Sequence, residues 1–328
     1  MDVEIGRDRY EVVDGFFQRP RGWTFVEVAD VGVDRDDNVY VFCRGTHPVM
    51  IFDREGRFLD AWGELGQNSF TFPHGLSVGL DGFVYTADSR DHTVRKWTND
   101  GKLVMTLGSA HQNAPAFSGK PFNRPTHATA APNGDIYVSD GYGNARIHCF
   151  SPAGELKFSW GAPGNGPGEF NTVHSVFIDD SDNTLYAADR YNNRVQFFTL
   201  AGAYLGEWTG LRLPQSVRKG PDGAFHVAEL ANRVTVLDRA GTVLARWGDS
   251  VDLDDDFATG GVDLALPDAP SRHPMVRGRV HNDPGPGLFC APHGIAVDSA
   301  GSFYVAESSE SWIGLDRGSR SVQKFIRK

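Results

Sequence analysis

Six segments of this chain follow one pattern, and this repeat constrains the fold more than any other feature of the sequence. In each segment a short apolar strand leads through a turn rich in Gly, Asp or Asn into a second strand, and a third and a fourth strand follow. Alternating apolar residues joined by tight glycine turns are what antiparallel hairpins require. The sequence therefore predicts a series of antiparallel sheets. Four of the outermost strands end in a tryptophan: Trp62, Trp160, Trp208 and Trp247.

Four strands per unit, repeated about every 40 to 50 residues, is the range of β-propeller blades. The last repeat stops after its third strand, at Phe325, whereas Tyr10–Val13 is a strand without a blade of its own. We therefore expect the N-terminal strand to complete the sixth blade and close the ring, because closure removes open sheet edges. The predicted fold is all-β: a six-bladed β-propeller that forms one domain over residues 1–328, with no segment of helical periodicity.

The composition narrows the classes of partner. The net charge is -10 and no run of Lys or Arg stands out, which disfavours a nucleic-acid surface. The cysteines Cys43, Cys149 and Cys290 are far apart and odd in number, which indicates a reducing compartment rather than a disulfide framework. The N-terminus lacks an apolar signal segment, and no stretch approaches the roughly 18 apolar residues of a membrane span. We therefore expect a cytoplasmic protein that binds neither nucleic acid nor membrane.

Two sets of polar residues are predicted to face one mouth of the propeller, because the first strand of each blade lines the channel. The inner strands start at Asp30, His74, His127, His174, Gln215 and His293. The second strands end at Arg44, Asp88, Asp140, Asp189, Glu229 and Glu307. The spacing between the two sets is nearly constant, which predicts two polar rings at that mouth.

Three of the inner-strand histidines suggest a metal site. His74, His174 and His293 fall in the second, fourth and sixth repeats, so a closed six-fold ring separates them by rotations of about 120° and lets three imidazoles converge on one ion with an open position. The expected cofactor is Zn²⁺ or another divalent transition metal. His127, in the third repeat, is a fourth ligand, a general base or a channel residue tied to Asp30.

The repeats resemble those of the NHL family, on the runs Asp140–Ile147 and Asp189–Val195, each of which carries Asp, Asn and Arg before Ile or Val. The contexts of the three histidines, FPHGLS, TVHSVF and APHGIA, together with FCRG and SDGYGNARI, resemble the peptidyl-α-hydroxyglycine α-amidating lyase domain. Members of that family are six-bladed propellers that bind Zn²⁺ through three histidines and cleave an N-acyl carbinolamide into an amide and glyoxylate.

The resemblance implies roles for individual residues. It places the metal on His74, His174 and His293, a cation that binds substrate or stabilises charge at Arg44, and a general base at Tyr142. A cation and a Lewis acid stabilise the alkoxide and carboxylate charge that develops in such a reaction. A phenol beside them loses its proton more readily, and the resulting phenolate acts as a base.

The sequence also departs from the lyase pattern. Gly294 stands where the lyases have an Asp that helps to bind a structural Ca²⁺, Ala291 replaces an active-site Met, and His127 replaces an Asp. The disulfides of the lyases have no counterpart among the three cysteines. These departures leave the substrate and the Ca²⁺ site open.

One connection between blades is predicted to be a lid. Residues 249–289 are rich in Asp, Gly and Pro and have no strand pattern, and a loop of that length in a compact domain is commonly a lid or a disordered segment. It joins a fourth strand to a first strand, so it lies on the face of the predicted site.

Three functions follow from these features. The first is a metal-dependent enzyme, either a lyase or a hydrolase or hydratase, that acts on a small and anionic substrate. The second is a non-catalytic NHL propeller that binds a protein or RNA. The third is a Ca²⁺-dependent hydrolase of the lactonase kind, which would use oxygen ligands. That alternative depends on further site residues that offer carboxylate oxygens: Asp30, Asp88, Asp140 and Glu307.

Overall fold

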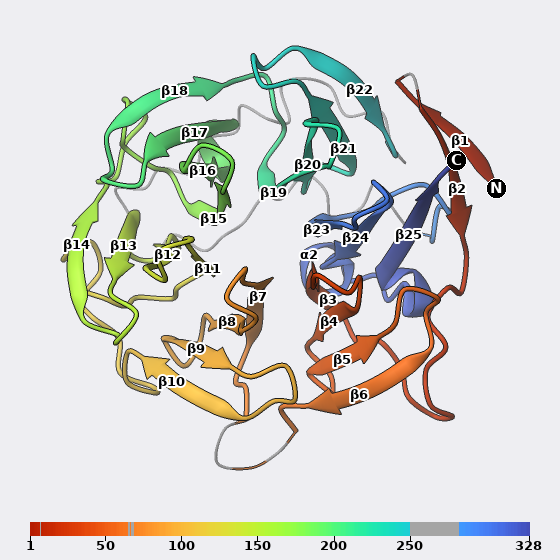
Figure 1. Ribbon diagram of the computed structural model, residues 1–328, viewed down its shortest axis with the longest axis horizontal. Coiled ribbons are helices and arrows are strands. Elements are labelled where there is room, and N and C mark those ends of the chain that lie inside the picture. Colours follow the sequence, from red (N-terminus) through yellow and green to blue (C-terminus); the bar gives the residue numbers. More distant parts are fainter. Residues whose placement is uncertain (7, 65, 67–68, 250–281) are drawn as a thin grey trace. The chain divides into compact units, whose positions relative to one another are not determined.

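The predicted series of antiparallel sheets is confirmed by the computed structural model (Figure 1). The structure describes residues 1–6, 8–64, 66, 69–249 and 282–328, and these residues form six sheets, the blades of a six-bladed β-propeller. The described residues divide into two compact units. Unit 1 contains those in the ranges 1–62, 215–249 and 282–328, and unit 2 contains those in the range 63–214.

Unit 2 holds three four-stranded sheets, which we call blades 2, 3 and 4. Blade 2 consists of β7 (Pro73–Val78), β8 (Val84–Asp88), β9 (Thr93–Trp97) and β10 (Leu103–Leu107). Blade 3 consists of β11 (His127–Ala130), β12 (Ile136–Asp140), β13 (Arg146–Phe150) and β14 (Leu156–Trp160). Blade 4 consists of β15 (Val173–Asp179), β16 (Thr184–Asp189), β17 (Arg194–Thr199) and β18 (Tyr204–Trp208), with the 3-10 turn η1 (Arg190–Asn192) after β16. The first strands β7, β11 and β15 are neighbours, which brings the starts of these strands together.

Unit 1 holds blades 1, 5 and 6. Blade 1 consists of β3 (Val28–Val33), β4 (Val39–Cys43), β5 (Val49–Phe52) and β6 (Phe58–Trp62). Blade 5 consists of β19 (Pro214–Lys219), β20 (Phe225–Glu229), β21 (Arg233–Leu237) and β22 (Val243–Trp247). Blade 6 contains β23 (Pro292–Val297), β24 (Phe303–Glu307) and β25 (Val322–Arg327). The strand β23 lies beside β3 of blade 1 and β20 of blade 5.

The N-terminal strand completes blade 6, as the sequence predicts. The strand β2 (Asp8–Val13) pairs antiparallel with β25, with Tyr10 opposite Arg327 and Val13 opposite Lys324. A further strand, β1 (Asp2–Ile5), pairs with β2 and makes this sheet five-stranded, which the repeat pattern did not predict.

The described residues also include one short α-helix, α2 (Ser309–Ile313), and a second 3-10 turn, η2 (Gly318–Ser321). Both lie in the connection between β24 and β25. The sequence pattern predicted no helical segment, because a helix of five residues is too short to show a helical period.

The hairpin between β7 and β8 shows how the local sequence builds a blade. Gly82 adopts a φ of 78°, which an L-residue with a side chain rarely adopts. Its N–H donates to Gly79 O at 3.0 Å, and Gly79 N–H donates to Phe83 O at 2.8 Å. The carboxylate of Asp81 accepts the phenol of Tyr85 at 2.6 Å. A glycine turn and one aspartate therefore fix the ends of both strands.

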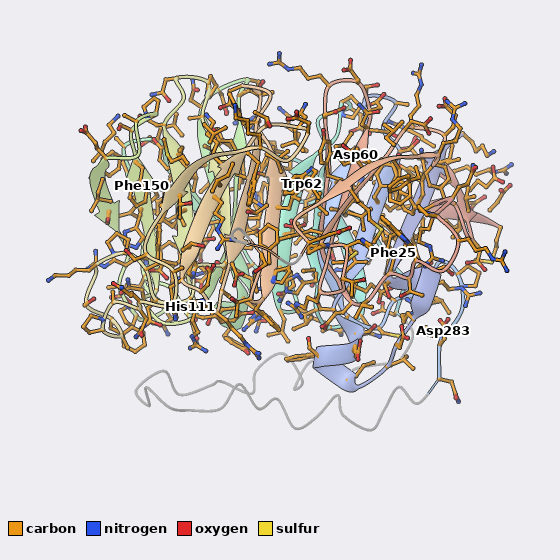
Figure 2. The ribbon with its side chains drawn as sticks, turned by 90° about the horizontal axis from the view of Figure 1, so that it is seen from below. Phe25, Asp60, Trp62, His111, Phe150 and Asp283 are labelled. Carbon is orange, nitrogen blue, oxygen red and sulfur yellow. The ribbon has the colours of Figure 1, made fainter. Side chains whose placement is uncertain are left out.

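The hydrophobic core lies between neighbouring blades. In unit 2, one cluster joins blades 2 and 3 and includes Phe150, and another joins blades 3 and 4. In unit 1, one cluster joins blades 1 and 6 and includes Phe25, and another joins blades 5 and 6. Phe25 and Phe150 are labelled in Figure 2, as are the buried Trp62 and the exposed Asp60 on β6. Blades 2, 3 and 4 pack on one another in order within unit 2, and blades 5, 6 and 1 do so within unit 1, so the inner strands have fixed neighbours within each unit.

Most of the predicted lid, residues 249–289, is not described, because the part 250–281 lies outside the described residues. The two ends of that connection are paired, because Phe289 N–H donates to Gly248 O at 2.8 Å.

Among the described helices, none has the length and apolar character to cross a membrane.

Burial of His226 predicts a loss of stability in acid. This side chain on β20 is 3% exposed and packs beside the ring of Phe303. Burial lowers the pKa of His226 from its usual 6.5 to about 4. Between these values the unfolded chain binds a proton that the folded chain does not, so the free energy of unfolding falls as the pH falls from 6.5 toward 4, by about 3 kcal/mol for this residue.

Replacement of His226 by Phe should remove this part of the acid sensitivity. Urea unfolding at a series of pH values measures the slope directly. The same slope in wild type and His226→Phe would contradict the assignment, and the exposed His111→Ala is the control.

Candidate active site

The three histidines predicted to bind metal occupy the same unusual position in their strands. In β7, Pro73 pairs with Asp88 and Gly75 pairs with Ala87, so His74 is the additional residue of a β-bulge. The register of β15 skips His174 in the same way, and that of β23 skips His293. A bulge turns the side chain of the additional residue away from the ordinary strand alternation. Three equivalent bulges therefore give the three imidazoles equivalent directions within their own blades.

Backbone carbonyls fix the orientation of two of these rings. The Nδ1 atom of His74 lies 2.7 Å from the carbonyl oxygen of Thr126, at the start of the next blade. The Nδ1 atom of His293 lies 2.6 Å from the carbonyl oxygen of Ala29, again in the next blade. Since a carbonyl only accepts, each Nδ1 carries the hydrogen and each Nε2 has a lone pair. This is the tautomer that a metal ligand needs.

Glycine after the histidine permits this close approach. A Cβ on Gly75 would lie 2.3 Å from Thr126 O, and a Cβ on Gly294 would lie 2.2 Å from Asp30 Oδ1. Both distances are far below van der Waals contact, so a side chain at either position would push the two blades apart. The pair His-Gly is therefore a structural unit in blades 2 and 6.

His74 and His174 come together around Tyr142 in unit 2. The two imidazole rings have centroids 4.8 Å apart. The hydroxyl of Tyr142, which follows β12, lies 2.9 Å from His74 Nε2 and 3.4 Å from His174 Nε2. Because His74 Nδ1 carries the hydrogen, the hydroxyl donates to His74 Nε2. Both histidines are nearly buried, at 1% and 3% exposed. The structure thus joins two predicted metal ligands to the predicted base.

Arg190 is a member of this cluster that the sequence analysis missed. It follows β16, is 4% exposed, and its Nη1 atom donates to the hydroxyl of Tyr142 at 3.4 Å. Its Nη2 atom donates to the hydroxyl of Tyr191 at 3.1 Å, and its guanidinium lies 5.1 Å from the ring centre of Tyr142. The repeat pattern predicts functional residues only up to Asp189, where the second strand ends, and Arg190 is the next residue.

The register of blade 1 corrects the predicted rings. In β3, Val28 pairs with Cys43 and Asp30 pairs with Phe42, so the bulge falls on Ala29. The residue equivalent to His74 is therefore Ala29 rather than Asp30, and the equivalent of Asp88 is Cys43 rather than Arg44. Arg44 instead shares its position with Arg190 of blade 4, since each follows the residue opposite the start of the inner strand.

Arg44 and Asp30 lie in unit 1. The Nη1 atom of Arg44 forms a 2.9 Å ion pair with Glu27 and donates to Ser311 Oγ at 3.1 Å. Asp30 is 3% exposed, and its Oδ1 atom accepts the N–H of Val31 at 2.9 Å. The catalytic role of Arg44 stays a prediction, since Tyr142 lies in unit 2.

His127 differs from the three bulge histidines. It pairs directly with Ser139 on β12, without a bulge, and is 2% exposed. Its register matches that of Gly75 rather than that of His74. The spacing from His127 to Asp140 is one residue shorter than that from His74 to Asp88, which was the signal in the sequence for the missing bulge.

The acidic residues at the ends of the second strands anchor the entry to each inner strand. Asp88 accepts the N–H of Phe72 at 2.9 Å, Asp140 that of Asn123 at 3.0 Å, and Glu307 that of Ala291 at 3.0 Å. Each acceptor is 0–1% exposed. Burial raises the pKa of Glu307, while Arg317 opposes this effect. These carboxylates therefore hold the loops before the inner strands, and a role toward a ligand stays a prediction.

The comparisons with known proteins agree with the repeat and the fold. The NHL repeat model matches residues 70–97 and 289–314, and a 6-bladed beta-propeller model matches residues 128–226. The solved streptogramin B lyase structure aligns over 99% of this chain and 100% of its own, with a TM-score of 0.60 at 16% identity. At that identity the likeness concerns the fold alone.

Curated relatives share more of the sequence over shorter stretches. Human NHL repeat-containing protein 3 is 31% identical over 209 residues, which are 59% of each chain. The Drosophila melanogaster peptidyl-alpha-hydroxyglycine alpha-amidating lyase 1 is 40% identical over 147 residues, 40% of this chain and 26% of the relative. A probable lyase of the same name from Caenorhabditis elegans is 35% identical over 49% of this chain and 45% of its own.

The chain thus spans less than two thirds of the length of these relatives. On its repeats and its blades, it is a six-bladed β-propeller of NHL repeats that has peptidyl-α-hydroxyglycine α-amidating lyases among its relatives.

Proposed function

We propose that this protein is a metal-dependent lyase that cleaves a small anionic carbinolamide of the N-acyl-α-hydroxyglycine type. The observation that carries the proposal is the cluster in unit 2, where the hydroxyl of Tyr142 lies 2.9 Å from Nε2 of His74 beside the guanidinium of Arg190. The similarity to two amidating lyases supports the same reaction class.

The donor set suits a divalent transition metal, and we propose that His74, His174 and His293 bind one ion. His74 and His293 have the same bulge, the same Nδ1 bond to a carbonyl and the same following glycine. Three neutral imidazoles are typical ligands of catalytic Zn²⁺ and are poor ligands for Ca²⁺. When bound, such an ion supplies Lewis-acid stabilisation of an oxygen anion.

The residues of the chain supply the proton transfers. We propose that Tyr142 acts after its phenol has released its own proton to solvent: the phenolate, which the positive charge of Arg190 would stabilise, takes the proton of the carbinol hydroxyl. The oxygen then forms the carbonyl group of glyoxylate, the C–N bond breaks with its electron pair on nitrogen, and the nitrogen takes the proton to give the amide. Arg44 binds the carboxylate of the substrate, whose charge is retained in glyoxylate.

Two alternatives remain distinguishable by experiment. The same residues would suit a hydrolase or hydratase, which would consume water and would not release the intact amide that a lyase forms together with glyoxylate. The second alternative is a non-catalytic NHL propeller; human NHL repeat-containing protein 3, whose name states no reaction, aligns with 59% of this chain. Such a protein would have no need of a transition metal.

Metal analysis tests the proposed ligands first. The purified protein, loaded with Zn²⁺ and dialysed, should retain close to one equivalent. His174→Ala should lose most of it, because two imidazoles hold an ion far less well than three. The exposed His111→Ala should keep its metal (Figure 2). Retention of one equivalent of zinc by His174→Ala would contradict the proposed ligand set.

Replacement of Tyr142 by Phe tests the base. We expect kcat for glyoxylate release from an N-acyl-α-hydroxyglycine to fall roughly 10²–10⁴-fold, the usual value of a positioned acid or base. The metal content should not change, since phenylalanine preserves the packing. Tyr204→Phe, at a 38% exposed tyrosine on β18, is the matched control. Wild-type turnover in Tyr142→Phe would refute the proposed role.

Replacement of Arg44 by Ala tests the substrate cation. If Arg44 binds a carboxylate whose charge is better stabilised in the transition state, KM should rise and kcat should fall together. Steady-state kinetics against the exposed Arg57→Ala variant separates this from a general effect of charge. A change in neither constant would exclude Arg44 from the reaction.

A further inference from the structure

We propose that Glu27 is a positioning residue that holds the guanidinium of Arg44, and that α2 completes this arrangement as a third contact. The inference rests on the proposed function, since it assigns Arg44 its place in that reaction. Glu27, Arg44 and α2 all lie in unit 1, so their contacts are contacts within one compact unit.

The side chain of Glu27 bridges the two other elements. Its Oε2 atom lies 2.9 Å from Nη1 of Arg44, and its Oε1 atom accepts the N–H of Ser311 at 2.7 Å. The same Nη1 atom donates to Ser311 Oγ at 3.1 Å. Glutamate, arginine and serine thus form a closed triangle, and moving any one of them breaks two bonds.

The ion pair within this triangle is largely shielded from water, whereas Ser311 is exposed. The side chains of Arg44 and Glu27 are 9% and 7% exposed. An ion pair in such a place is screened weakly, whereas a surface pair contributes little. Loss of the carboxylate would leave a desolvated guanidinium without this partner, so the pair has a strong influence on where the guanidinium lies.

The backbone at Glu27 also brings this residue close to Arg44. Its φ is 41°, in the left-handed region, as at Thr172 and Leu213 (66° and 53°), which stand directly before the inner strands of blades 4 and 5. This conformation therefore belongs to the entry into the inner strand. Here the N–H of Arg44 donates to the carbonyl oxygens of Val26 and Glu27, at 3.0 and 3.2 Å. Main chain and side chain therefore hold the same two residues together.

The role of α2 follows from its connections. Ser308, before the helix, donates its N–H to Ala291 O at 3.1 Å, two residues before His293. Ser311, within the helix, meets Glu27 and Arg44. The short helix therefore joins the strand that presents a proposed metal ligand to the proposed substrate cation.

Glu27→Gln tests the proposal with two readouts in the full-length, zinc-loaded protein. The first is the rate at which phenylglyoxal modifies Arg44, followed by peptide mass spectrometry, which should rise severalfold because the guanidinium is no longer held. The second is the kinetics of glyoxylate release, in which kcat/KM should fall roughly 10- to 100-fold, as expected for a misplaced catalytic cation. The zinc content should stay at the wild-type value.

A double-mutant cycle separates positioning from structural support. In the Arg44→Ala background, Glu27→Gln should cause no further loss of kcat/KM, because its effect acts through Arg44. Asp298→Asn is the matched control: it removes another buried carboxylate of unit 1, which accepts the N–H of Ser302 at 2.8 Å. It should change neither the labelling of Arg44 nor the kinetics.

The outcomes distinguish this proposal from the proposed function. Unchanged labelling of Arg44 in Glu27→Gln, or equal losses of kcat/KM with and without Arg44, would overturn the positioning role. Absence of glyoxylate release by the wild-type protein would overturn the lyase reaction, while the labelling of Arg44 would still decide whether Glu27 holds it.

Discussion

The β-bulge at the start of an inner strand is the constraint on which the proposed site depends. In an ordinary antiparallel pair, successive side chains point to opposite faces of the sheet, and the side chain after Pro73 would follow this alternation. The additional residue breaks this alternation and turns His74, His174 and His293 in a common sense within their blades. Blade 3 lacks the bulge, and its histidine His127 is held differently. The backbone, rather than the residue type, thus distinguishes a proposed ligand from a neighbouring histidine.

Buried carboxylates anchor the loops before the three strands that carry the bulge histidines. Buried N–H donors in these loops need acceptors. Asp88 and Glu307 accept such N–H groups directly before the strands of His74 and His293. In blade 4, Asp189 accepts the N–H of Asn171 at 2.7 Å and pairs with Arg194 at 2.8 Å. In blades 2, 4 and 6 the acid at the end of the second strand therefore holds the loop before the histidine strand.

In blades 1 and 4, the position directly after the second strand carries a cation. Arg190 and Arg44 occupy equivalent places in blades 4 and 1, and each has specific partners: the hydroxyl of Tyr142 for the first and the carboxylate of Glu27 for the second. Guanidinium groups suit this position because they present several N–H donors in a fixed plane. One repeated backbone position thus provides two separately supported charges, which the proposed function assigns to the reaction of an anionic substrate.

The blade architecture, the closing strand and the equivalent positions of the three histidines could be predicted from the sequence. Those features depend on local alternation, on turn glycines and on a repeat that shows equivalent positions directly. The register of blade 1, the inclusion of Arg190 and the support of Arg44 by Glu27 and Ser311 became visible only in the folded structure. The reason is that a bulge shifts pairing by one residue without changing the residue pattern, so Ala29 and Asp30 cannot be told apart by spacing. The contact between Arg44 and Ser311 joins residues 267 positions apart, and no local pattern predicts which side chains will meet over such a separation.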